Sequence, residues 1–185
     1  MAILERQFVF SGAVSGAWSV QSMHVFCGEP LAAAPMLSID QSPSTDAVWS
    51  LVGVTSNMRY TTSAEAGALT QKRAALGRSQ ARLAALIPIR KNEAWWALPQ
   101  DERRAIYAER SHHTTLGLEF LPRIARRQHL SRDLGEPFDF LTWFEFAPEH
   151  ESDFEHLLQR LRTSEEWSYV DREIDIRLRR VEPFP

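Results

Sequence analysis

Three early stretches of the chain are apolar runs bounded by Gly, Pro and Ser, which is the pattern of β-strands. The stretches cover residues 7–10, 17–26 and 48–54, and they are rich in aromatic and β-branched residues. Between the second and the third, residues 28–46 contain many Pro, Ala and Ser residues without a clear period, which predicts a long surface loop. The first part of the chain is therefore expected to consist mainly of strands.

The next stretch carries a helix signal. Thr62 stands three residues before Glu65, the spacing of a capping box, and this predicts a helix through about Ala75. Residues 76–77 interrupt the pattern, and a second helical stretch is expected to continue to about Leu83.

A strand and a bent helical region follow. Residues 84–91 have the composition of a strand, and Pro88 predicts that this strand lies at a sheet edge or contains a bulge. Pro99 suits the first turn of the next helix. The helical pattern after it is disturbed at Gly117 and at Pro122, so we expect this region to bend.

The last third predicts strand, helix and strand. Residues 138–146 alternate with aromatic residues on both faces, which predicts a central strand. Pro148 then begins a helix whose apolar residues recur at helical spacing, namely Phe154, Leu157, Leu158 and Leu161. Residues 170–181 predict a final strand with Ile174, Ile176 and Leu178 inward, and with Glu173, Asp175, Arg177 and Arg179 outward.

This order of elements predicts an α+β fold. After residue 84 the sequence strand, helix, strand, helix, strand is that of a ferredoxin-like half, and a more β-rich half precedes it. We place the boundary between residues 1–83 and residues 84–185, within one compact unit.

Composition narrows the functional classes. The net charge of −3 over 185 residues gives no basic footprint, so we expect neither nucleic acid nor a membrane as a partner. Cys27 is the only cysteine, which excludes an internal disulfide, a cysteine-rich zinc site and covalent haem attachment. No secretory segment and no membrane-spanning run is recognisable, and we expect a cytoplasmic protein.

Common catalytic motifs are absent from the sequence. His150 and His156 lie six positions apart rather than the four that a zinc protease helix requires. There is no nucleophile elbow, no P-loop and no GxGxxG motif.

Residues 111–132 remain as the candidate for chemistry. His112 and His113 diverge by about 100° on a helix, so one of them can face inward. On their pattern alone, Arg126 and Arg127, near Arg123 and Arg132, are better explained as a solvated helix face. However, this region is surrounded by apolar residues that could line a flat cavity. A histidine on one wall and an arginine on the other would suit a haem and an anion. These apolar residues are Leu116, Leu118, Leu121, Ile124, the strand at 138–146 and the pair Trp95 and Trp96.

Residues 87–150 resemble the haem-binding half of the chlorite dismutases, specifically their short, dimeric, cytoplasmic branch. The resemblance extends through residues 165–178 and, more weakly, to residues 53–62. It implies two ferredoxin-like halves arranged as a dimeric α+β barrel, with haem b bound non-covalently in the C-terminal half. It also implies a homodimer with chlorite as substrate.

The resemblance assigns roles to individual residues. His113 matches the proximal ligand of the haem iron and Arg126 the distal arginine. Glu166 matches a glutamate that hydrogen-bonds the proximal imidazole, and Lys91 a lysine in the same network. Trp95 and Trp96 match a tryptophan pair by the haem and the subunit interface, and Ile87 and Leu121 are expected among the cofactor contacts. One departure concerns the distal side, where short relatives often carry a glutamine four residues before a glycine and this chain has Arg73 before Gly77.

The implied activity is that of a chlorite O2-lyase, which converts chlorite to chloride and dioxygen through a ferryl haem and a hypochlorite-level fragment held by Arg126. Two alternatives remain. One is a coprohaem decarboxylase of the same superfamily, which the arginine at position 126 disfavours. The other is a noncatalytic haem carrier or sensor, which would need the pocket without the anion-holding arginine.

Overall fold

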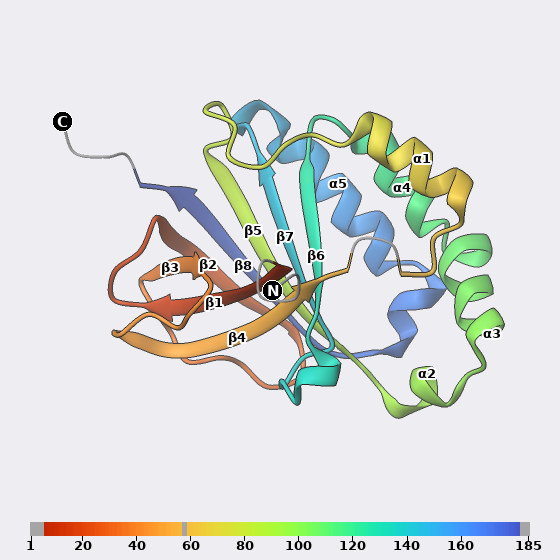
Figure 1. Ribbon diagram of the computed structural model, residues 1–185, viewed down its shortest axis with the longest axis horizontal. Helices are drawn as coiled ribbons and strands as arrows, with labels where there is room; N and C mark the ends of the chain where they lie inside the picture. Colours follow the sequence, from red (N-terminus) through yellow and green to blue (C-terminus); the bar gives the residue numbers. More distant parts are fainter. Residues whose placement is uncertain (1–5, 57–58, 182–185) are drawn as a thin grey trace.

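The computed structural model describes residues 6–56 and 59–181 of the chain. Within these residues the strands form one closed antiparallel barrel in the order β1-β3-β2-β8-β5-β7-β6-β4. The helices gather on one side of the barrel, over β5, β6, β7 and β8 (Figure 1). The strands are β1 (Gln7–Ala13), β2 (Trp18–Cys27), β3 (Met36–Asp40), β4 (Ala47–Thr55), β5 (Leu83–Lys91), β6 (Ala125–Leu130), β7 (Phe140–Phe146) and β8 (Val170–Arg180).

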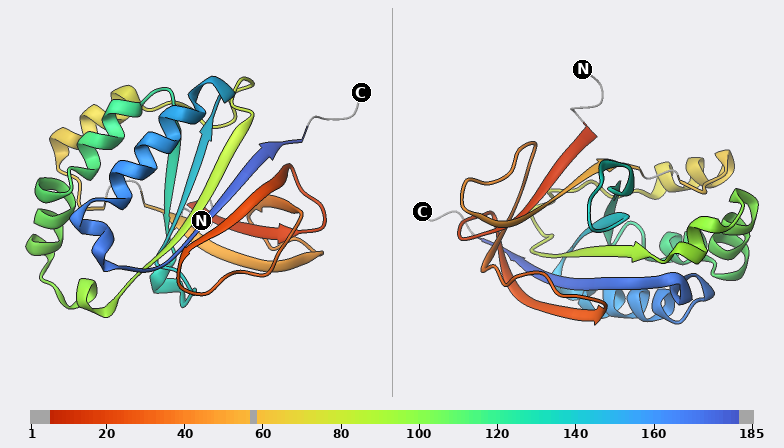
Figure 2. Two further views of the ribbon diagram at one scale, coloured as in Figure 1. Left: turned by 180° about the vertical axis from the view of Figure 1, so that it is seen from behind. Right: turned by 90° about the horizontal axis from the view of Figure 1, so that it is seen from below.

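The helical layer is built from several short helices and one long one. Views from behind and from below show it as a second layer beside the barrel (Figure 2). The α-helices are α1 (Ser63–Lys72), α2 (Glu93–Ala97), α3 (Gln100–Arg104), α4 (His113–Phe120) and α5 (Glu151–Arg162). A π-helix, η2 (Ala105–Arg110), continues α3, and three 3₁₀ helices are η3 (Arg132–Leu134), η4 (Pro148–His150) and η5 (Glu165–Tyr169). No described helix is long and apolar enough to cross a membrane.

Two apolar cores follow from the alternation of side chains along the strands. The first fills the barrel and receives Leu86 from β5, Trp143 from β7 and Ile176 from β8. The second lies between the outer face of the sheet and the helices, and receives Ile87 from β5 and Phe144 from β7. The four apolar positions predicted on α5, Phe154, Leu157, Leu158 and Leu161, are all buried in this second core. The strand pattern thus positions an apolar wall opposite the helical layer.

Most predicted elements are confirmed. The strands predicted at 7–10, 17–26, 48–54, 84–91, 138–146 and 170–181 correspond to β1, β2, β4, β5, β7 and β8. Thr62 and Glu65 form both bonds of the capping box of α1. The weaker resemblance at residues 53–62 includes residues 57 and 58, which lie outside the described part.

Three predictions about loops and helices are wrong. Residues 28–46 are not one long loop, because β3 pairs with β1 along its full length and with the start of β2. The second helical stretch expected up to Leu83 is absent, since residues 73–82 contain turns and bends without a helix. Gly117 lies inside α4 and does not interrupt it. The bend comes later, where the chain turns after Phe120 and enters β6, a strand that the sequence did not predict.

The predictions about β5 and β8 are right in part. Pro88 lies in a strand paired on both sides, to β7 and to β8, so the predicted edge is wrong, whereas the pairing of β5 with β8 does contain an irregularity, between Arg90 and Lys91. Proline is tolerated at position 88 because Leu86 and Ile89 are paired with residues of β8 and the two residues between them are not. Glu173 and Asp175 do not face solvent, since Arg162 from α5 contacts both carboxylates and the helical layer buries them.

Candidate functional site

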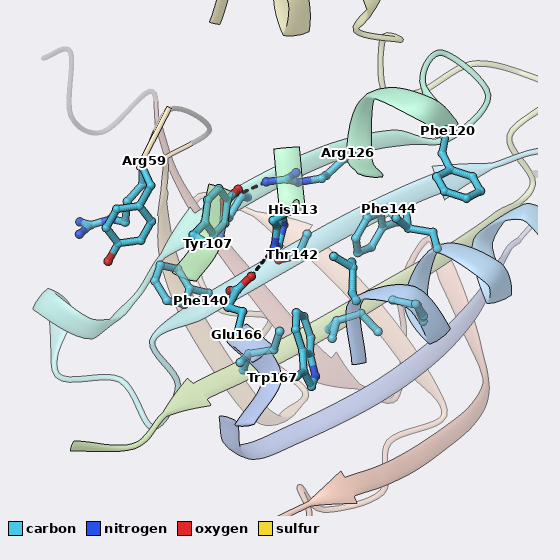
Figure 3. A pocket seen from close by; sticks show the side chains of 18 of the residues that line it. Arg59, Tyr107, His113, Phe120, Arg126, Phe140, Thr142, Phe144, Glu166 and Trp167 are labelled. Carbon is cyan, nitrogen blue, oxygen red and sulfur yellow. Dashed lines mark hydrogen bonds and ion pairs between the residues drawn. The ribbon is translucent and has the colours of Figure 1, made fainter. Parts of the chain in front are cut away.

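A pocket with mainly apolar walls lies between the sheet and the helical layer (Figure 3). The sheet contributes Ile87, Thr142 and Phe144, and the helices contribute Leu157 and Leu161. All of the predicted site residues line this pocket: Ile87, Lys91, Trp95, His113, Leu121, Arg126 and Glu166. Residues far apart in the sequence are therefore brought together at one place.

His113 is the first residue of α4 and its side chain is only 12% exposed. The preceding His112 is exposed and has a left-handed backbone conformation with φ of 53°, which turns the chain just before the helix. Nδ1 of His113 lies 2.6 Å from Oε2 of Glu166. Because a carboxylate at Nδ1 favours the tautomer that is protonated there, Nε2 remains as the nitrogen available to a metal.

Glu166 is a buried carboxylate held by a network. Its Oε1 accepts a hydrogen bond from Nζ of Lys91 at 2.9 Å, and its backbone N–H donates to Oγ of Ser111 at 2.8 Å. Burial opposes ionisation of this carboxyl, but the charges and hydrogen bonds of Lys91 and His113 outweigh burial and lower its pKa to about 2. Glu166 is therefore ionised at neutral pH and gives the His113 imidazole a negatively charged partner.

Arg126 reaches the pocket from β6. Along this strand Arg126 and Gln128 face the pocket, while His129 lies inside the barrel and is fully buried. Nη2 of Arg126 donates to Oε1 of Gln128 at 3.0 Å. The neighbouring Arg127 lies on the other face of the strand, where Nε donates to Nε2 of His129 at 3.0 Å. The alternation of a strand, rather than the face of a helix, thus decides which arginine enters the pocket.

The two adjacent tryptophans have different surroundings. Trp95 is buried, lines the pocket and has its ring 4.6 Å from Nζ of Lys91. Trp96 does not line the pocket, and its Nε1 donates to Oδ2 of Asp139. The two side chains therefore diverge: Trp95 lines the pocket, whereas Trp96 only stacks on the lining residue Phe140.

The predicted apolar wall is only partly right. Leu121 and Ile124 line the pocket, whereas Leu116 packs in the core beside it and Leu118 is not among the lining residues. Arg73 is exposed and does not line the pocket. Leu69 is the lining residue that α1 contributes, so the departure at position 73 does not add a further arginine to Arg59 and Arg126 among the pocket walls.

Sequence reasoning missed several polar and aromatic residues of the pocket, chiefly Tyr107, Gln128, Arg59 and Tyr60. The Tyr107 ring stacks on the His113 ring with 4.3 Å between centroids, and its hydroxyl accepts a hydrogen bond from Arg126 (Figure 3). Burial raises the pKa of Tyr107, so its hydroxyl stays protonated at neutral pH. If residues 125–130 had been predicted as a strand, the alternation of its side chains would have placed Gln128 on the same face as Arg126. No local sequence pattern indicates that Tyr107 belongs to the site.

Three buried polar atoms of the lining residues have no hydrogen-bond partner among the described residues: Tyr60 Oη, Arg59 Nε and Trp95 Nε1. A buried donor without a partner is costly, so these groups are suited to an oxygen-bearing ligand. A flat apolar group with carboxylates would satisfy both the apolar walls and these donors. The donor set therefore fits a haem, and the imidazole of His113 could bind its iron.

The comparison with known proteins supports the same kind of molecule. The chlorite dismutase family model matches residues 33–180. A curated chlorite dismutase from Ideonella dechloratans is 32% identical over 103 residues, which are 55% of this chain and 35% of that protein. The matched segment is thus only about a third of the relative's length.

Solved structures extend the comparison to nearly the whole chain. A dimeric chlorite dismutase from Nitrobacter winogradskyi is 55% identical with a TM-score of 0.89, covering 94% of this chain and 99% of that chain. A chlorite dismutase from Candidatus Nitrospira defluvii in complex with imidazole is 28% identical with a TM-score of 0.59, covering 75% of this chain and 56% of the other.

Proposed function

The chain belongs to the chlorite dismutase family, and on this basis we propose that it is a haem b-dependent chlorite O2-lyase, which converts chlorite to chloride and dioxygen. The observation that carries the proposal is the pocket, which joins a histidine bonded to an ionised buried glutamate with an arginine from the opposite layer. The substrate and the product chloride are small anions, and a permanently charged guanidinium is suited to holding them.

His113 and Glu166 would hold the cofactor from the helical layer, with His113 as the iron ligand. Lys91 keeps Glu166 ionised, and Glu166 in turn orients the imidazole and increases its electron donation. Ile87 and Leu121 would contact the macrocycle, and Trp95 lies beside Lys91. The unpartnered donors of Arg59, Tyr60 and Trp95 are suited to the carboxylates of the group.

Arg126 would bind the chlorite anion. Bound haem would supply the redox-active iron at which one oxygen atom leaves chlorite and the O–O bond is later formed. The charge and donors of Arg126 would retain the chlorine-containing fragment in the pocket until chloride and dioxygen are released. The mainly apolar walls would lower the local dielectric around the arginine and so strengthen its attraction for an anion.

The assembly and the organisation of the chain form part of the same proposal. We infer a homodimer, because the relative from Nitrobacter winogradskyi is dimeric and matches almost the full chain. All lining residues except Arg59, Tyr60 and Leu69 come from residues 84–185, which supports a C-terminal ferredoxin-like half, residues 84–185, that binds the cofactor and an N-terminal half, residues 1–83, that completes the barrel.

An oxygen-electrode experiment tests this function. The purified protein is loaded with haem b, chlorite is added, and dioxygen, chloride and residual chlorite are measured. One dioxygen and one chloride per chlorite consumed is the expected result. No dioxygen from a haem-loaded protein would contradict the proposal, and mass loss from a bound porphyrin after addition of peroxide would identify a decarboxylase instead.

A further inference from the structure

Gly117 is a glycine for which the helix that contains it gives no reason. It lies inside the eight-residue helix α4, and glycine in a helix interior is less favourable than alanine because it loses more conformational freedom on folding. A left-handed backbone would require a glycine, but the described glycines with positive φ are Gly28, Gly77 and Gly135. The backbone of α4 would therefore accept alanine at position 117.

Packing against the rest of the protein does not require a glycine there either. Leaving aside its chain neighbours and the backbone of α4, a Cβ at Gly117 would have one described heavy atom within 4 Å, namely Nη1 of Arg126 at the ordinary contact distance of 3.8 Å. At Gly53, by contrast, a Cβ would lie 2.6 Å from Cβ of His129, so any side chain there would clash. Gly117 instead lines the pocket, which leaves a ligand of the pocket as the reason for its small size.

The side chain that Gly117 lacks would extend toward His113. Residues 113 and 117 are four positions apart on α4 and therefore share one face of the helix. The Cα–Cβ bond of a helical residue tilts toward the N-terminus, so a side chain at position 117 would cover the turn that begins with His113. Because this Cβ position is also 3.8 Å from Nη1 of Arg126, the side chain would enter the space between His113 and Arg126 that the proposed function gives to the haem.

We propose that Gly117 is a cofactor-contacting position, whose lack of a side chain allows the flat face of the macrocycle to lie against α4 beside His113. This inference rests on the proposed function, in which His113 binds the haem iron. Because an imidazole is short, a macrocycle whose iron it binds lies close to the helix, and the residue one turn further along has little clearance from it. The glycine makes room for the cofactor but lowers the stability of the cofactor-free protein, so substitution should change these two properties in opposite directions.

Thermal unfolding of the cofactor-free protein gives the first measurement. Gly117→Ala should raise Tm by about 2 to 4 °C, because alanine favours the helix and its methyl group meets no atom at short distance. Gly67→Ala is the matched control, because Gly67 is an exposed interior residue of α1 where a Cβ would meet nothing within 4 Å. It should raise Tm by a similar amount. A lower Tm for Gly117→Ala would overturn the proposal, because it would show that the protein itself needs the glycine.

Retention of haem gives the second measurement. Loaded protein is mixed with an excess of an apo-globin that captures released haem, and the rate is followed in the Soret region. Gly117→Ala should release haem about fivefold faster than the wild type and Gly117→Leu about a hundredfold faster, the range that overpacking of a well-packed site produces. Leucine, like alanine, favours a helix, so a weakened α4 would not give this trend. Gly67→Ala should release haem at the wild-type rate, because Gly67 does not line the pocket.

The two measurements together decide the inference. A higher Tm without cofactor and faster haem release in the same Gly117→Ala protein support it, and so does folded Gly117→Leu protein that takes up no haem. Equal release rates for the wild type, Gly117→Ala and Gly117→Leu would overturn it while leaving the proposed function intact. Wild-type protein that takes up no haem would overturn both the proposed function and this inference.

Discussion

Glu166 shows how one buried side chain can determine the state of another. An isolated buried carboxyl would be driven toward its neutral form, yet Lys91 and His113 together keep this one ionised. The ionised form is the one that can accept the Nδ1 proton of His113. The orientation of the His113 imidazole therefore depends on Lys91, which acts on it through Glu166. For this reason the presence of a histidine in the sequence does not by itself predict its chemistry.

The role of His113 can be tested with its neighbour as control. His113→Ala should abolish the Soret band of protein reconstituted with haem, because the ligand nitrogen is removed. His112→Asn should retain the band, since His112 is exposed and asparagine tolerates its left-handed backbone. Absorption spectra after removal of unbound haem provide the measurement. A full Soret band in His113→Ala would contradict the assignment.

Arg126 should govern both substrate affinity and enzyme lifetime. Arg126→Ala is expected to weaken chlorite binding by roughly ten- to a hundredfold, the effect of losing a charge-assisted hydrogen bond. It should also increase inactivation per turnover, because the reactive fragment is no longer retained. Counting turnovers until activity ceases measures this directly, with the exposed Arg123→Ala as control. An unchanged number of turnovers in Arg126→Ala would argue against retention.

At the scale of elements, β6 explains both a success and a failure of sequence reasoning. The resemblance gave Arg126 as the arginine of interest, and the structure brings it to the pocket with Gln128. The strand itself was missed, because its residues 126–129 are Arg, Arg, Gln and His, so neither face carries an apolar pattern. Its polar side chains are matched by partners from β7, η2 and the barrel interior, and these contacts are nonlocal and invisible in the sequence.

Strand β6 also predicts a pH effect on stability through His129. This residue is fully buried, and its Nε2 accepts from Arg127 while Nδ1 donates to the carbonyl of Leu141. Burial is the main cause that lowers its pKa from 6.5 to about 4. The unfolded chain therefore binds a proton at higher pH than the folded chain does, so stability should fall as the pH drops from about 6.5 to about 4.

Lowering the pKa of His129 from 6.5 to about 4 corresponds to a change in unfolding free energy of about 3 kcal/mol at most. Urea unfolding at several pH values between 7 and 4 measures it. The pH dependence in this window should be smaller in His129→Gln than in the wild type, whereas substitution of the exposed His24 should not change it. Equal slopes for His129→Gln and the wild type would show that His129 does not couple folding to protonation.

At the scale of the whole molecule, a charged cluster joins the helical layer to the barrel. Arg162 on α5 bonds Glu173 and Asp175 on β8, and Glu173 also accepts from Nε1 of Trp167, which lines the pocket. The acidic residues of β8 were expected to face solvent because they alternate with apolar ones. A sequence pattern reports two faces of a strand, but it does not report that a helix covers the second one.

The cluster should respond very differently to single and double substitution. Glu173→Ala removes one of the two carboxylates that Arg162 contacts and leaves the Trp167 N–H without its partner, and we expect a loss of about 3 to 5 kcal/mol in unfolding free energy. The paired change of Arg162→Met with Glu173→Leu should recover much of it, because it removes both charges. Chemical denaturation gives both values. A double variant no more stable than Glu173→Ala would indicate that the charges themselves are required.

The two faces of β6 have a consequence for which changes in chain length this protein can accept. A strand side chain changes face with every residue, so lengthening or shortening the chain by one position on entry to β6 would exchange the sides of Arg126 and Arg127 and bury Gln128 beside Phe10. A guanidinium would still enter the pocket, but without its glutamine acceptor. Functional descendants of this sequence should therefore have no insertions or deletions at residues 121–124, even though that turn is partly exposed. Changes in length should occur instead in turns that do not decide which face of a strand enters the pocket.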